Sequence, residues 1–173
     1  MAKNTNKVKK VAVLTSGGDA SGMNACVRAC VRYALDQGYE VYGVKHGYKG
    51  MVNDEIFKME YSSVSNCVHA GGTILRSSRC PEFKDPEVMN AAVENLLKRG
   101  IENLIVIGGD GSFRGVEAMH EGTKLNVIGI PGTIDNDMGY TDSTIGFDTA
   151  CNTVVDAILK LRDTITSHDR IMI

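Results

Sequence analysis

The chain has 173 residues, 43% hydrophobic and 23% charged, which is typical of one globular domain with a sizeable core. Lys and Arg number 19 and Asp and Glu 21, so the net charge of -2 gives no electrostatic reason to expect nucleic acid or an anionic membrane as a partner. The N-terminus is polar, and no apolar run approaches the ~20 residues of a membrane span. The five cysteines are odd in number and form no Cys-x-x-Cys pair, so we expect neither a disulfide framework nor a zinc site. A reducing cytoplasm is the expected location.

Strands and helices alternate along the whole sequence. In chain order, the apolar patterns predict a strand over 11–14, a helix over 23–37, a strand over 41–45, a short strand near Ile56, a short helix near 64–68 and a helix between Asp85 and Gly100. They then predict a strand over 104–107, a helix over 113–121, a strand over 127–130, a helix over 147–163 and the start of a strand over 170–173. We expect Val154, Ile158 and Leu161 to face inward from the last helix. This alternation predicts one α/β domain, a parallel-sheet three-layer sandwich of Rossmann-like type.

Three of the predicted strands end in loops made of Gly, Ser or Thr, and Asp. The loops are Gly17-Gly18-Asp19, Gly109-Asp110-Gly111-Ser112 and Thr133-Ile134-Asp135-Asn136-Asp137. Because parallel strands end on one edge of a sheet, we expect the three loops to surround one cleft. Glycine loops before helices let backbone N–H groups reach phosphate oxygens, and carboxylates beside a phosphate hold Mg²⁺ or take a proton. The sequence therefore predicts phosphoryl transfer at this cleft.

Each loop alone has a simpler interpretation. A single Gly-Gly-Asp is more often a turn, and Asp-Asn-Asp is usually a solvated cap; three such loops after three strands favour a functional site. The sequence that follows Gly17 lacks the Gly-x-x-x-x-Gly-Lys-Ser/Thr pattern of a Walker-type phosphate loop. It also lacks the Gly-x-Gly-x-x-Gly pattern of a dinucleotide-binding fold.

The three loops together resemble signature segments of the 6-phosphofructokinases. The matching segments are 14–25, 108–112 and 131–137, with further matches at Gly71-Gly72-Thr73, Arg79 and 167–170. The resemblance begins at Val11 and covers the rest of the chain. It implies an ATP-binding N-terminal domain with the catalytic loop over 1–173, which transfers phosphate from ATP to the 1-hydroxyl of fructose 6-phosphate in glycolysis. It also implies that the family's second, sugar-phosphate domain is absent from this chain.

The resemblance assigns roles to individual residues. Asp135 is expected to be the general base, Thr133 and Asp137 to position the transferred phosphate and its metal, and Asp110 to bind Mg²⁺. The expected ATP site consists of Gly17, Arg79, Cys80, Gly109, Asp110, Gly111 and Ser112. The expected sugar-phosphate site consists of Thr133, Ile134, Asp135 and Arg170. Arg170 is expected to serve the active site of a neighbouring subunit, in a homo-oligomer that the resemblance implies is a tetramer.

A second, allosteric site is also implied. Arg28 and Arg32 lie one turn apart on the first helix and by themselves indicate a solvated face. The resemblance places them with Arg162 in a site for a nucleoside diphosphate or phosphoenolpyruvate. Glu55 stands where bacterial members often carry an arginine, so we expect its carboxylate to weaken control by an anionic effector.

Two alternatives stay open. A pyrophosphate-dependent relative usually has Asp at the position of Gly111 and Lys at that of Gly132, so the two glycines favour ATP. The other alternative is a truncated, non-catalytic nucleotide-binding fragment, because the chain ends at Ile173. We expect the 173 residues alone to bind nucleotide weakly and not to phosphorylate the sugar.

Overall fold

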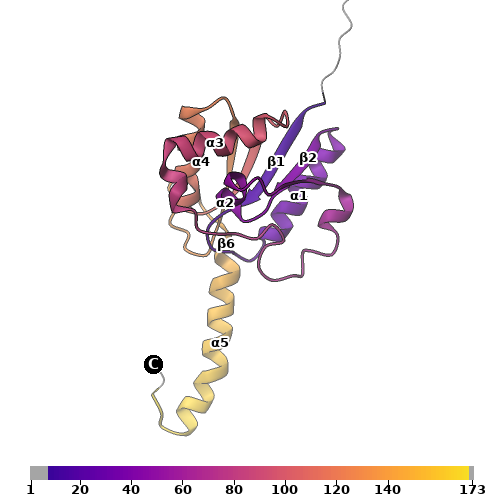
Figure 1. Ribbon diagram of the computed structural model, residues 1–173. Helices are drawn as coiled ribbons and strands as arrows, with labels where there is room; N and C mark the ends of the chain where they lie inside the picture. The colour runs from indigo at the N-terminus through magenta and orange to yellow at the C-terminus, as the bar shows by residue number, and fades with distance from the viewer. Residues whose placement is uncertain (1–7, 172–173) are drawn as a thin grey trace, which may run out of the picture.

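The computed structural model describes residues 8–171 and is built on a six-stranded sheet with the order β3-β2-β1-β4-β5-β6 (Figure 1). The strands are β1 (Lys10–Thr15), β2 (Glu40–Val44), β3 (Ile56–Met59), β4 (Asn103–Gly108), β5 (Asn126–Thr133) and β6 (Ile145–Gly146). All neighbours are parallel except β2 and β3, which pair antiparallel. The α/β prediction is confirmed; the antiparallel edge arises because the β2–β3 connection is too short for a parallel crossover.

Helices cover both faces of the sheet and make the three predicted layers. One face carries α1 (Met23–Asp36) with the 3-10 turn η1 (Tyr61–Val64) beside it. The other carries α2 (Gly47–Val52), α3 (Pro86–Leu97) and α4 (Asp110–Gly122), with the 3-10 turn η2 (Pro81–Lys84). The side chains of β1 alternate between the two cores, as in any strand buried on both faces. Val11 and Val13 face α1, whereas Ala12 and Leu14 face the α2–α3 side.

Two element boundaries beside the predicted cleft differ from the expected ones. Helix α4 begins at Asp110 instead of residue 113, because the amides of Ser112 and Phe113 both bond to the Gly109 carbonyl, at 3.0 and 3.1 Å. Strand β5 continues past residue 130 to Thr133, since its last residues pair with the short strand β6. The second loop is therefore the first turn of a helix, and the third loop starts at the very end of a strand.

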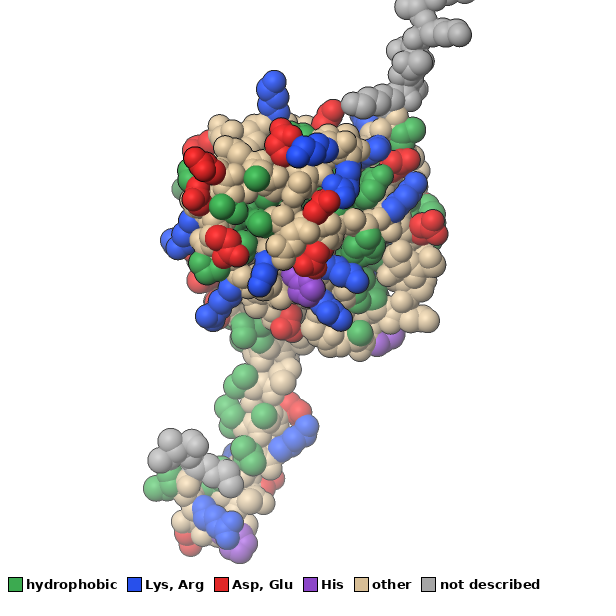
Figure 2. All heavy atoms as spheres, in the orientation of Figure 1, with side chains coloured by type: hydrophobic (Ala, Val, Ile, Leu, Met, Phe, Trp, Pro, Cys, Tyr) green, Lys and Arg blue, Asp and Glu red, His purple; other side chains and the backbone are tan. Residues whose placement is uncertain are grey.

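The last helix, α5 (Phe147–Ser167), corrects an expectation about packing. It projects away from the sheet, and its apolar side chains form a visible stripe along it (Figures 1 and 2). Val154, Ile158 and Leu161, predicted to face inward, are 57%, 58% and 46% exposed. The periodicity correctly indicated an amphipathic helix, but Gly146, with φ of 111° at its start, turns the helix away from the sheet.

The strand predicted over 170–173 is not seen in its described part. Arg170 and Ile171 have no regular secondary structure, and residues 172–173 lie outside the described residues. Within residues 8–171, none of the helices combines the length and the apolar character needed to cross a bilayer.

Gly50 in α2 gives a test of this packing. A Cβ atom at this position would lie 1.6 Å from the Lys45 carbonyl oxygen, a backbone atom that cannot rotate away. We expect Gly50→Ala to lower the free energy of unfolding by roughly 3 kcal/mol, measured by urea denaturation. Gly139→Ala is the matched control, because nothing lies within 4 Å of a Cβ there. Similar losses in both variants would contradict the packing described at Gly50.

Candidate functional site

Three parallel strands deliver the predicted loops to one edge of the sheet. In the register of the sheet, Thr15 at the end of β1 pairs with Ile107 of β4, and Gly108 pairs with Pro131 of β5. The Ser16 amide extends the first pairing by donating to the Ile107 carbonyl at 2.9 Å. The three loops thus leave the sheet side by side, as the sequence predicted.

A cleft of about 780 Å³ opens between these loops. It is lined by residues 16–19, Tyr48, residues 78–81, Lys84, residues 109–112, residues 132–135 and Asp137. All the loop residues predicted for the ATP and catalytic sites lie here, together with Arg79 and Cys80. The structure therefore brings these residues together, while their chemical roles stay predictions.

The floor of the cleft is backbone with little side-chain cover. A Cβ at Gly108 would lie 2.5 Å from the Ser112 hydroxyl oxygen and 2.6 Å from the Ser16 carbonyl oxygen, so the first two loops touch through this glycine. Gly17 adopts φ of 84°, a conformation that glycine accepts most easily. Because the first amides of a helix lack intrahelical acceptors, the start of α4 at this rim presents N–H groups and a positive dipole end. These features suit an anionic ligand.

Two cations line the cleft without acidic partners. Neither Arg79 nor Lys84 takes part in an ion pair among residues 8–171. An unpaired guanidinium or ammonium at a cleft wall is available to phosphate oxygens. Lys84 was missed by the sequence analysis, because η2 is a single 3-10 turn with no periodic pattern that could assign its side chain to the cleft.

The carboxylates of the cleft are held locally. The Asp110 carboxylate accepts a hydrogen bond from the Arg114 guanidinium at 3.0 Å, one turn along α4, and both side chains are exposed. The Asp135 amide donates to the Thr133 hydroxyl oxygen at 3.2 Å, and the Thr133 hydroxyl lies 3.5 Å from the Asp135 carboxylate. The buried Thr144 hydroxyl donates to the Thr133 carbonyl at 2.7 Å. Thr144 thus fixes the third loop from below, a contact that the sequence did not indicate.

A second, more apolar cavity of about 600 Å³ continues the cleft beyond Gly111. It shares Tyr48, Cys80, Lys84, Asp110 and Gly111 with the first, and is otherwise lined by Phe83, Pro86, Met89, Arg114, Gly115 and Ala118. The rings of Tyr48 and Phe83 stack with centroids 4.3 Å apart. A cavity of this size and lining accepts a flat, largely apolar ring.

Burial keeps two side chains of this cavity, Tyr48 and Cys80, in their neutral, protonated forms. Burial raises the pKa of Tyr48, whose hydroxyl donates to the Ser112 carbonyl at 2.6 Å. Burial also raises the pKa of the Cys80 thiol, with Glu82 adding to the effect. Cys80 therefore lines the cavity as a protonated thiol. This form is unreactive, because the reactive form of cysteine is the thiolate.

The predicted effector arginines make separate contacts in the structure. Arg28 donates to the Val64 carbonyl at 3.0 Å, and the Arg32 guanidinium lies over the Tyr61 ring, 6.0 Å from its centroid. Arg162 is an exposed residue of the projecting helix α5. Arg28 and Arg32 share a surface beside η1, but the described contacts do not join Arg162 to it. The effector site stays a prediction.

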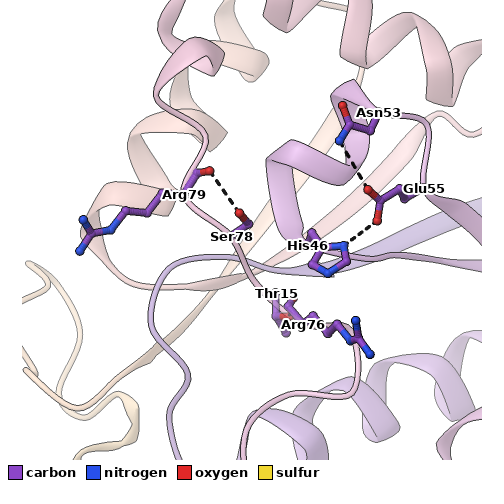
Figure 3. A network of polar contacts seen from close by, with 7 residues as sticks. All are labelled: Thr15, His46, Asn53, Glu55, Arg76, Ser78 and Arg79. Carbon is purple, nitrogen blue, oxygen red and sulfur yellow. Dashed lines mark hydrogen bonds and ion pairs between the residues drawn. The ribbon is translucent and has the colours of Figure 1, made fainter.

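The Glu55 carboxylate is hydrogen-bonded to His46 (Figure 3). Its carboxylate accepts a hydrogen bond from His46 Nδ1 at 2.5 Å and lies 3.5 Å from the Asn53 amide nitrogen. The hydrogen bond from His46 lowers the pKa of Glu55, so the carboxylate stays ionised. No contact with Arg28 or Arg32 is formed among the described residues, so the expected role of Glu55 toward an effector also stays a prediction.

Arg170 lies outside the cleft. It follows α5, where its amide donates to the Ile165 carbonyl at 3.1 Å, and its side chain is exposed. Figure 1 places this end of the chain far from the sheet edge that carries the loops. The structure therefore does not bring Arg170 together with Asp135, and its expected use by a neighbouring subunit stays untested.

A cleft outside the carboxyl ends of parallel strands, with a helix beginning at its rim, is the arrangement by which α/β domains bind phosphate compounds at a sheet edge. The sequence matches the phosphofructokinase family over residues 10–173. The chain belongs to this family.

Several relatives are similar over nearly all of this chain. The ATP-dependent 6-phosphofructokinase of Clostridium botulinum strain Eklund 17B is 59% identical over 166 residues, which cover 96% of this chain and 52% of that protein. The Staphylococcus aureus strain JH9 protein of the same name is 59% identical over 167 residues, with the same two shares. The structure of phosphofructokinase from Saccharomyces cerevisiae superposes with a TM-score of 0.85 at 37% identity, over 92% of this chain and 25% of that one. The chain thus spans about half the length of the curated relatives it matches.

Proposed function

We propose that the protein carrying this chain is an ATP-dependent 6-phosphofructokinase, which transfers the γ-phosphoryl group of ATP to the 1-hydroxyl of fructose 6-phosphate. The observation that carries this proposal is the cleft where the three loops meet, which joins a polar part lined by the glycine loops to a more apolar cavity. The names of the two bacterial relatives at 59% identity support the same activity.

The apolar cavity favours ATP over pyrophosphate as the donor. A nucleotide needs room for a base next to its phosphates, and the cavity between the Tyr48–Phe83 stack and α4 supplies that room. Pyrophosphate has no base and would leave this cavity unused. The passage between the two parts runs past Gly111, where nothing lies within 4 Å of a Cβ position. A side chain at this point would obstruct the nucleotide.

Transfer of the phosphoryl group requires charge neutralisation and a base beside the attacking hydroxyl. Arg79 and Lys84 supply positive charge from one wall, and the amides at the start of α4 supply it from the floor. Asp135 on the opposite wall accepts the proton from the sugar hydroxyl. The Thr133 hydroxyl, near the Asp135 carboxylate, orients that carboxylate, and Asp137 completes the acidic wall.

The donor set of the cleft also fits Mg²⁺. Among residues 8–171, no cluster of three or more His, Cys, Asp or Glu forms a complete metal site. Mg²⁺ with a nucleotide needs only one or two carboxylates, since phosphate oxygens and waters supply its other ligands. Asp110, at the rim between the two cavities, would hold the ion, which neutralises phosphate charge when bound.

The remaining parts of the proposal concern the acceptor and the assembly. We propose that fructose 6-phosphate lies beside Thr133, Ile134 and Asp135, of which Ile134 is 51% exposed and free to contact a ligand. Arg170 would contact the sugar phosphate in a neighbouring subunit of a homo-oligomer, a tetramer. All five cysteines are free, which supports a cytoplasmic location.

Asp135→Asn tests the base. We expect turnover to fall by roughly 10²–10⁴-fold in the protein that carries this chain, because the amide cannot accept the proton, whereas KM changes much less. Steady-state kinetics with ATP and fructose 6-phosphate measure both. Asp142→Asn, the same change outside the cleft, should behave like wild type. Turnover close to wild type in Asp135→Asn would exclude Asp135 as the base.

Asp110→Ala tests the metal ligand. Removing the carboxylate should raise the Mg²⁺ concentration needed for half-maximal activity by about tenfold or more, without loss of folding. Arg114→Ala is the control, because it breaks the same ion pair and leaves the carboxylate in place. If both variants show the same metal dependence, the effect comes from the ion pair and Asp110 does not bind Mg²⁺.

Gly111→Asp tests the donor. An added carboxylate in the passage between the two cavities should repel the nucleotide phosphates and raise KM for ATP by about tenfold or more. Gly139→Asp adds the same charge at another open position and should leave KM unchanged. A wild-type protein that uses pyrophosphate better than ATP would refute the proposed donor.

A further inference from the structure

The segment that carries Arg79 into the cleft has little regular structure to hold it. Between β3 and α3, the described chain forms only the short turns η1 and η2, and residues 73–80 run as a loop until η2 begins at Pro81. Arg79 is exposed and its guanidinium has no ion-pair partner among residues 8–171, so no ion pair fixes its position there. The Ile74 amide donates to Asn24 Oδ1 at 2.8 Å and the His46 amide donates to the Leu75 carbonyl at 2.9 Å, so these two contacts hold the segment only up to the residue before Arg76.

Thr15 lies beneath this segment with a fully buried side chain. Its hydroxyl donates to the Arg76 carbonyl at 2.9 Å and lies 2.9 Å from the Thr73 hydroxyl. A hydroxyl has one proton, and Thr15 has given its own to Arg76, so Thr73 must be the donor between the two threonines. Thr73 in turn accepts from the Leu75 amide at 3.3 Å. The hydrogen bonds therefore run in one direction, from the Leu75 amide through Thr73 and Thr15 to the Arg76 carbonyl.

This arrangement fixes a strained turn three residues before Arg79. Arg76 adopts φ of 59°, which is uncommon for a side chain of its size. The turn is closed by the Arg76 amide, which donates to the Thr73 carbonyl at 3.0 Å, and it is attached to the sheet through the Thr15 hydroxyl. In Figure 3, Thr15 and Arg76 lie next to each other, while the Arg79 side chain extends away from them.

We propose that Thr15 is a positioning residue for phosphate binding: its buried hydroxyl ties the turn at Arg76 to the end of β1 and so holds Arg79 at the cleft. The same strand end leads directly into Ser16 and Gly17, which line the cleft from the other side. This hydroxyl thereby links the strand that leads into the first glycine loop to the segment that carries the arginine. This inference rests on the proposed function, since it treats Arg79 as a phosphate contact.

Thr15→Val tests the inference because it keeps the shape of the buried side chain and removes only the hydroxyl. We expect the dissociation constant for Mg²⁺-ATP, measured by calorimetry, to rise about tenfold, as the Arg76 carbonyl and the Thr73 hydroxyl lose their partner. Thr15→Ser retains the hydroxyl and should bind ATP like wild type. Thr123→Val is the matched control, since the Thr123 hydroxyl also bonds to a backbone carbonyl, at 2.7 Å, at the end of α4 far from the cleft.

A second measurement separates positioning from general stability. In an Arg79→Ala background, Thr15→Val should change ATP affinity by less than about twofold, because the contact it positions is already gone. Equal effects with and without Arg79 would overturn the inference, and so would a variant that only unfolds more easily while it binds ATP normally. Should Thr15→Val fail to fold, Thr73→Val removes the hydroxyl that donates to Thr15, and it should raise the dissociation constant in the same direction by a smaller factor, again only when Arg79 is present.

A ligand-free readout distinguishes failure of this inference from failure of the proposed function. Amide hydrogen exchange over residues 74–79 should be faster in Thr15→Val and unchanged in Thr123→Val. Unchanged exchange in Thr15→Val would refute the tie between Thr15 and the turn. Faster exchange, combined with ATP binding that is the same in wild type and Arg79→Ala, would instead refute the proposed role of Arg79 in ATP binding.

Discussion

The hydrogen-bond register between β1, β4 and β5 determines everything else at the cleft. With Thr15 opposite Ile107 and Gly108 opposite Pro131, the three strands end within about three residues of a common line. Because strand direction is the same in all three, their loops can only meet on that side. A shift of one strand by a single residue would turn its side chains to the other face and separate the loops.

Two kinds of residue build the cleft above this edge. Glycines and helix amides provide the surface that a phosphate would touch, while buried hydroxyls below them hold the loops in place. Thr15 joins the end of β1, which leads into the first loop, to the segment that carries Arg79. Thr144 supports the third loop. Both hydroxyls bond to backbone carbonyls, so they fix chain direction without adding charge. The cleft that we propose for highly charged ligands thus rests on neutral, hydrogen-bonded groups, which avoids the cost of burying an unpaired charge.

The sequence predicted the parts that depend on local pattern. Short apolar runs and glycine stops identified most strands and helices, and loop composition correctly indicated that three loops meet at one edge. It could not predict where α5 would lie, because the periodicity that marks Ile158 as part of an apolar stripe does not say what the stripe packs on. Lys84 and Thr15 were also missed: their roles depend on the path of an irregular segment, which no periodic signal encodes. Family resemblance supplied residue roles, but these concern chemistry that geometry alone does not test.

The base of helix α5, at Gly146, packs directly against the first loop. Gly146 packs so closely on the first loop that a Cβ there would lie 2.7 Å from the Ala20 Cβ and 3.2 Å from the Ser21 carbonyl oxygen. The 21 residues beyond it extend about 30 Å at ~1.5 Å per residue, so a tilt of roughly 10° moves the far end by about 5 Å. A tilt of the helix about its base is therefore centred on the residue that packs against the first loop.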